Sequence, residues 1–200
     1  MTKTIGRRAL TLALFSLVMV VSVPAPAVAT PSVTSTIDVG DVPFTVAFTP
    51  NGKKAYVTNA DDDTVSVINV KIGAVQGDPI VVGDWPRGLA FSKDGKRAYV
   101  TNGIGDTVTV INVKTGTVQG DPINVGDYPT SLALSKDGKN AYVTNAGDGT
   151  VSVINIKTGT VQGAPIAVGV FPRSVAFSKD GKWAYVANTF GGTVSVINTR

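Results

Sequence analysis

The feature that most constrains the fold of this chain is a short segment that recurs at a fixed interval. The pentapeptide AYVTN occupies residues 55–59, 98–102 and 141–145, and it returns as AYVAN at 184–188. The tyrosines of these copies stand at positions 56, 99, 142 and 185, so consecutive copies are 43 residues apart. A period of this length, with short β-rich segments separated by glycine and aspartate, is typical of propeller blades. We therefore predict an all-β fold with one blade for each repeat.

Each repeat divides into four strand-like segments. In the second repeat, Gly88–Phe91 is followed by an Asp-Gly pair that favours a tight hairpin, and then by Arg97–Thr101. Thr107–Asn112 is rich in β-branched residues, and a last strand is predicted around Pro122–Val125. These segments predict blades of four antiparallel strands.

The two ends of the repeat array suggest how a ring could close. Thr36–Val39 aligns with the last segment of a repeat, and the chain finishes at Arg200 after the third segment of the fourth repeat. We therefore expect a β-propeller of four four-stranded blades, in which the N-terminal strand closes the last blade and removes an unpaired edge. Two alternatives remain: half of an eight-bladed dimeric ring, or a fragment of a larger propeller.

The first 29 residues differ from the repeats. Lys3 and an arginine pair precede the apolar run 9–23, and small residues at Ala27 and Ala29 provide a cleavage site. This pattern predicts a signal peptide over 1–29 and a propeller domain over 30–200, with contact with a membrane only during export. The expected location is extracytoplasmic, in the periplasm or at the cell surface, and the pattern leaves Sec and twin-arginine export both open.

The composition excludes several kinds of chemistry. The sequence contains no Cys, no His and no Glu, so it offers no thiol nucleophile, no imidazole base and no disulfide. We accordingly predict no catalytic residue, no cofactor and no metal site. Three of the 18 cationic residues and none of the 14 acidic ones lie in the predicted signal, which leaves a net charge of about +1 and does not favour nucleic acid as a partner.

The repeats differ mainly in two sets of loops. One set reads GDVPF, GDWPR, GDYPT and GVFPR, and the other reads NADDD, NGIGD, NAGDG and NTFGG. We expect both sets to open on one face, and aromatic and arginine side chains there are the types that dominate binding surfaces. The predicted binding residues are Trp85, Arg87, Tyr128, Phe171, Arg173, Phe190, Asp61, Asp62, Asp63 and Ile104.

The repeated motifs AYVTN, TVSVINV and KTGTVQGDPI resemble the YVTN family of β-propeller repeats, over roughly residues 33–200. The resemblance implies a propeller fold and a secreted or cell-surface protein, although members of the family often have seven blades. The related rings include lactonases and cofactor-dependent oxidoreductase domains.

The expected function is that of a secreted, non-enzymatic interaction module that binds a protein or a cell-envelope polymer through its loop-rich face. The first alternative is an enzyme, either lactonase-like or a cofactor-dependent oxidoreductase-type propeller. The second is a weak binder of nucleic acid or another polyanion through lysines at the opposite hairpins. A homodimer is expected if two chains share one ring.

Overall fold

The computed structural model describes residues 30–200, so the predicted signal peptide lies outside the described residues. Thr36–Arg200 form one compact unit. Within residues 30–200 the regular structure consists of strands, and no helix there is long and apolar enough to cross a membrane. The prediction of an all-β propeller is confirmed.

The strands follow the repeats. Blade 1 contains β1 (Pro43–Phe48), β2 (Lys54–Asn59), β3 (Thr64–Asn69), β4 (Ala74–Val75) and β5 (Ile80–Val81). Blade 2 contains β6 (Pro86–Phe91), β7 (Arg97–Asn102), β8 (Thr107–Asn112), β9 (Thr117–Val118) and β10 (Ile123–Asn124). Blade 3 contains β11 (Pro129–Leu134), β12 (Asn140–Asn145), β13 (Thr150–Asn155), β14 (Thr160–Val161) and β15 (Ile166–Ala167). Blade 4 contains β16 (Pro172–Phe177), β17 (Trp183–Asn188) and β18 (Thr193–Asn198).

The outer edge of each complete blade differs from the single strand that the sequence predicts. In blade 1, β4 and β5 both pair with β3, one at each end, so the outermost strand is split into two short pieces. The interruption falls at Gly77, whose φ is +77°, and at the proline that follows two residues later. A left-handed glycine and a residue without a backbone N–H cannot continue a regular ladder.

The blades pack face to face through apolar side chains. In the first interface, Tyr56 and Val65 of blade 1 lie in one buried cluster with Leu89 and Val100 of blade 2. Tyr56 meets Phe91 edge-on, with ring centroids 5.1 Å apart. The next two interfaces use equivalent residues. Blades 2 and 3 therefore each present one face to the preceding blade and the other face to the following blade.

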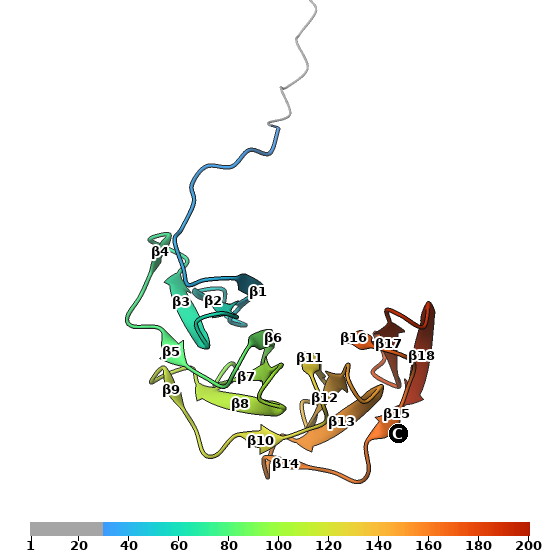
Figure 1. Ribbon diagram of the computed structural model, residues 1–200. Helices are drawn as coiled ribbons and strands as arrows, with labels where there is room; N and C mark the ends of the chain where they lie inside the picture. Colours follow the sequence, from blue (N-terminus) through green and yellow to red (C-terminus); the bar gives the residue numbers. More distant parts are fainter. Residues whose placement is uncertain (1–29) are drawn as a thin grey trace, which may run out of the picture. The chain divides into compact units, whose positions relative to one another are not determined.

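The predicted closure by the N-terminal strand is wrong. Thr36–Val39 forms no strand, and the fourth sheet contains only β16, β17 and β18. Figure 1 shows the blades of residues 36–200 as an open arc, with β1 and β18 at opposite ends. The alternative of a fragment of a larger propeller fits this arrangement.

Candidate binding site on the loop face

Hydrogen bonds join the two sets of variable loops in every blade. The Val42 carbonyl accepts the Ala60 N–H at 2.9 Å, which ties the loop before β1 to the loop between β2 and β3. The same bond recurs from Gly103 to Trp85 at 2.8 Å, from Ala146 to Tyr128 at 3.0 Å and from Thr189 to Phe171 at 3.0 Å. The two loop sets therefore share one face, as predicted, and we call residues 40–44, 59–63 and their equivalents in the other blades the loop face.

The residue before each loop proline has a left-handed backbone. The φ angles are 50° at Val42, 59° at Trp85, 55° at Tyr128 and 56° at Phe171. This conformation costs a residue with a side chain roughly 1–2 kcal/mol, so the surrounding hydrogen bonds must hold it in place. The loop face is thus built on four equivalent strained positions, each of which projects a different side chain.

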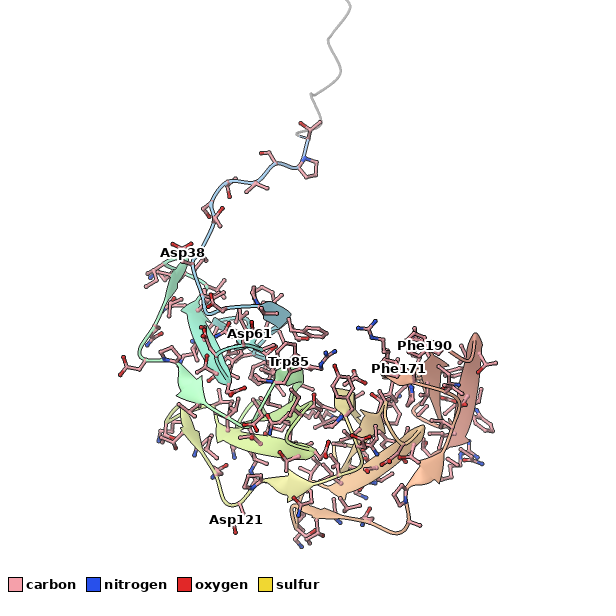
Figure 2. All side chains as sticks on the ribbon, in the orientation of Figure 1. Asp38, Asp61, Trp85, Asp121, Phe171 and Phe190 are labelled. Atoms are coloured by element: carbon pink, nitrogen blue, oxygen red, sulfur yellow. The ribbon has the colours of Figure 1, made fainter. Side chains whose placement is uncertain are left out.

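Two of the predicted aspartates accept hydrogen bonds from the backbone of these loops. Asp63 Oδ1 accepts the Trp85 N–H of the next blade at 2.8 Å, and Asp62 Oδ2 accepts the Asp41 N–H at 2.7 Å. The Asp61 side chain is exposed (Figure 2). Within residues 30–200 there is no group of three or more acidic, His or Cys side chains that could hold a metal ion. Asp62 and Asp63 therefore brace the loop backbone.

An asparagine amide at the same position of every blade packs beneath the loop. Asn102 Nδ2 donates to the hydroxyls of Thr107 and Thr109, at 2.9 Å each. A Cβ placed on Gly83 would lie 2.5 Å from that same nitrogen, so the loop can approach the amide only because residue 83 is glycine. The amide partners are thus side-chain hydroxyls of the neighbouring strand, which fix the amide beneath the loop.

The residue after each loop proline lies in a β-bulge. The register of the innermost strand shifts between Pro43 and Thr45, and it shifts at the equivalent place in the other three blades. Bulges are places where a sheet re-aims a side chain. The re-aimed residues are Phe44, Arg87, Thr130 and Arg173.

Arg87 is the more enclosed of the two arginines at these four positions. It is only 7% exposed, and its guanidinium carbon lies 4.7 Å from the ring centroids of both Phe44 and Tyr128. The Trp85 ring lies 6.0 Å away, and Arg87 Nη2 donates a hydrogen bond to the Tyr128 hydroxyl. The cation is therefore held between two aromatic rings that come from the preceding and following blades.

Arg87 forms no ion pair with a carboxylate of residues 30–200. Burial lowers the pKa of Arg87, the Tyr128 hydroxyl opposes that effect, and the positive charge of Arg173 lowers the pKa further. The three ion pairs among residues 30–200 all join Lys and Asp side chains at the inner hairpins. Arg87 Nε is also buried without a hydrogen-bond partner. An arginine of this kind is suited to bind an anion.

An aromatic row extends from Arg87 across blades 3 and 4. The ring centroids of Tyr128 and Phe171 are 6.2 Å apart, and those of Phe171 and Phe190 are 4.5 Å apart. Figure 2 shows Trp85, Phe171 and Phe190 on the inner side of the arc, whereas Asp121 lies on the outer rim. Ile104 is exposed on the loop face.

Ring–ring and cation–π contacts connect five of the predicted residues: Trp85, Arg87, Tyr128, Phe171 and Phe190. A sixth, Arg173, acts on Arg87 through its positive charge. Phe44 was not among the predicted binding residues. The signal for it was present, because Phe44 occupies the same place after the loop proline as Arg87 and Arg173.

The fold and the loop face define this chain as part of a β-propeller with an arginine–aromatic cluster at one end of its inner strands. Residues 38–200 match the family described as "Lactonase, 7-bladed beta-propeller". The chain belongs to this family. A search of curated proteins finds no match.

Several solved structures share the fold. Hydrazine synthase from Kuenenia stuttgartiensis is similar with a TM-score of 0.73 and 26% identity, over 84% of this chain and 49% of the other. A periplasmic gluconolactonase from Pseudomonas aeruginosa gives a TM-score of 0.67 and 25% identity, over 79% and 50%. A putative 6-phosphogluconolactonase from Bacteroides uniformis gives 0.71 and 21% identity over 79% and 50%, a level that shows the fold alone. The chain spans about half the length of these proteins.

These findings contradict the expectation of a non-enzymatic interaction module. The family that matches nearly all the repeats is a lactonase family, and proteins described as lactonases are among the similar structures. The expectation was wrong because the lack of His, Glu and Cys does not by itself exclude catalysis. A largely buried arginine between aromatic rings can stabilise negative charge without any of these residues.

Proposed function

We propose that this chain forms part of a lactonase-type propeller that hydrolyses a sugar lactone carrying a negative charge. The observation that carries the proposal is the unneutralised pair Arg87 and Arg173 on the loop face of a chain that belongs to a lactonase family. A phosphate or carboxylate on the substrate would supply the missing negative charge. Support also comes from the names of two similar proteins, a gluconolactonase and a putative 6-phosphogluconolactonase.

The two arginines would have different roles. Hydrolysis of a lactone places negative charge on the carbonyl oxygen as water adds to the carbonyl carbon, and a desolvated guanidinium stabilises such charge more strongly than one in water. Arg87 is the desolvated arginine, whereas Arg173 is exposed. We assign the developing oxyanion to Arg87 and attraction of the anionic substrate to Arg173. Among the residues of this chain, which include no His and no Glu, the carboxylates that could remove the proton from the attacking water are aspartates.

Acid release from 6-phosphogluconolactone and from gluconolactone tests the proposal, measured above the spontaneous rate in a pH-stat. We expect faster turnover of the phosphorylated lactone. Arg173→Gln should raise KM for the phosphorylated lactone and leave kcat/KM for the neutral lactone unchanged, whereas Arg87→Met should lower kcat about 100-fold or more. Lys93→Gln, which removes a charge from an exposed hairpin lysine, serves as the control. Absence of turnover with both lactones would refute the proposal.

The location of the protein is part of the same proposal. The charged and apolar pattern of residues 1–29 and the periplasmic description of the Pseudomonas aeruginosa protein support an extracytoplasmic enzyme with repeats of the YVTN type. Fractionation of expressing cells, with determination of the N-terminus of the exported form, tests it. An N-terminus at Thr30 is expected, and a full-length protein confined to the cytoplasm would contradict it.

A further inference from the structure

A groove of about 430 Å³ lies between blades 1 and 2, and we call it the rim groove. Lys54, at the start of β2, lines it, whereas the loop face begins where β2 ends at Asn59. The turn 114–116 of blade 2 also lines it, and β5 of blade 1 contacts β9 of blade 2 nearby (Figure 1). All its lining residues belong to two blades that each contain five strands, so the groove does not depend on the ends of the array.

The Tyr56 hydroxyl is the buried polar group of the rim groove. Tyr56 lines the groove and is fully buried, and its hydroxyl has no hydrogen-bond partner among the described residues. Burial raises the pKa of Tyr56, so the hydroxyl keeps its proton and can donate. A buried hydroxyl without a partner destabilises a fold, and an acceptor atom of a bound ligand would remove that penalty.

The equivalent groove between blades 2 and 3 contains an arginine instead of Lys54. Arg97 occupies this position, and its Nη1 donates to the Ile156 carbonyl of blade 3 at 3.2 Å. Burial raises the pKa of Tyr99, the equivalent of Tyr56, and the nearby Arg97 opposes that effect. The volume of this second groove is about 200 Å³. The groove with lysine is therefore the larger, and its tyrosine is the one whose hydroxyl is buried without a partner.

The charged side chains of the rim groove leave an excess of positive charge. Lys54 and Lys114 both line it, and neither takes part in the three ion pairs among residues 30–200. Asp78 is the carboxylate of the lining, and Thr115 adds a hydroxyl. The two ammonium groups favour a ligand with a negative charge, whereas the carboxylate and the hydroxyls are suited to hydrogen bonds with ligand hydroxyl groups.

We propose that the rim groove binds a sugar acid, a small molecule with one carboxylate and several hydroxyl groups. Lys54 and Lys114 attract the ligand carboxylate, Asp78 accepts a hydrogen bond from a ligand hydroxyl, and Tyr56 donates to a ligand oxygen. The volume of the groove falls in the range of small-molecule sites, which is roughly 300–1,000 Å³. The proposal does not rest on the lactonase activity, because the residues that line the groove lie outside the loop face.

Titration calorimetry with D-gluconate, D-glucose and acetate tests the proposed ligand class. D-glucose lacks the carboxylate and acetate lacks the hydroxyls, so both should bind roughly 10-fold more weakly than D-gluconate or worse. No binding of D-gluconate, or equal binding of D-gluconate and either of the other two, would overturn the proposal.

A charge-preserving substitution tests the location. Lys54→Arg introduces the residue that fills the groove between blades 2 and 3, so binding of D-gluconate should be lost although the charge is kept. Lys53→Arg makes the same exchange at an exposed lysine outside the groove and should bind like the unaltered protein. Loss of binding in Arg87→Met, together with unchanged binding in Lys54→Arg, would place the sugar acid on the loop face and overturn the proposal.

The tyrosine provides a second test that does not depend on filling the groove. Tyr56→Phe should weaken binding of D-gluconate roughly 10-fold or more, with an unchanged circular dichroism spectrum and no loss of thermal stability. Tyr99→Phe is the matched control, because it removes the equivalent hydroxyl beside Arg97 and should leave binding unchanged. Equal affinities of Tyr56→Phe and the unaltered protein would contradict a contact between the ligand and this hydroxyl.

Discussion

The enclosure of Arg87 between two rings predicts measurable coupling energies, which a pair of double-mutant cycles can determine. The first cycle combines Arg87→Met with Tyr128→Phe, which keeps the ring and removes the hydroxyl that accepts from Arg87 Nη2. A hydrogen bond to a charged group contributes about 1.5–3 kcal/mol, so we expect a coupling of about 2 kcal/mol. The second cycle combines Arg87→Met with Phe44→Leu. The Phe44 ring is 46% exposed, which places its cation–π contribution near the solvated value of about 1 kcal/mol.

Urea unfolding at one fixed protein concentration measures both cycles, because association would otherwise alter the apparent free energy of unfolding. A control cycle combines Arg87→Met with Phe177→Leu, whose ring packs edge-on against Tyr142 at 5.0 Å in another interface. We expect the control substitutions to be additive within about 0.3–0.5 kcal/mol. Coupling energies no larger than the control in both test cycles would refute the conclusion that the rings hold the guanidinium.

Three further predictions concern the scaffold. Hydrogen bonds, first from Ser135 and then from the Lys139 N–H, lower the pKa of Asp137, so its contribution to stability is complete above about pH 4 and is lost as the pH falls through the lowered value. Asp137→Asn should flatten acid unfolding curves, as Asn51 already makes the same turn in blade 1, and an unchanged acid midpoint would contradict this. Tyr56→Phe removes a buried hydroxyl that has no partner within the described residues, so the free energy of unfolding should stay equal or rise by about 1 kcal/mol; a clear loss would show a missed contact. Gly83→Ala should destabilise by about 1–3 kcal/mol in thermal unfolding, because its Cβ would collide with the Asn102 amide, and a neutral result would show that the loop can move away.

The blades could be predicted from the sequence because the hairpin and strand signals recur at the same places in each repeat. The Asp-Gly and Asn-Gly pairs specify the inner hairpins, and alternation within AYVTN and TVSVIN specifies which side chains face a neighbouring blade. The split outer strand was missed because two residues on each side of Gly77 give too short a pattern to separate from a turn. Ring closure was misjudged because the angle between blades depends on side-chain packing across an interface, as between Tyr56 and Phe91, which no local pattern reports.

The position of the loop face could be predicted from the sequence, but the contacts among its side chains could not. Variation between repeats identified Trp85, Arg87 and Tyr128 as residues released from the scaffold. The stacking of Arg87 on Phe44 joins residues of two blades, and it depends on a bulge that re-aims both side chains. Residue type alone could not distinguish this buried cation from the exposed Arg173.

The left-handed residue before each loop proline also bears on how such a chain can change. The backbone at Val42, Trp85, Tyr128 and Phe171 is held by the same carbonyl contact whichever side chain is attached. The conformational cost is therefore incurred once, by the architecture, and exchanging one of these side chains for another adds little to it. Single substitutions at these four backbone positions would therefore change which ligands the loop face prefers, while the packing of the blades beneath them stays the same.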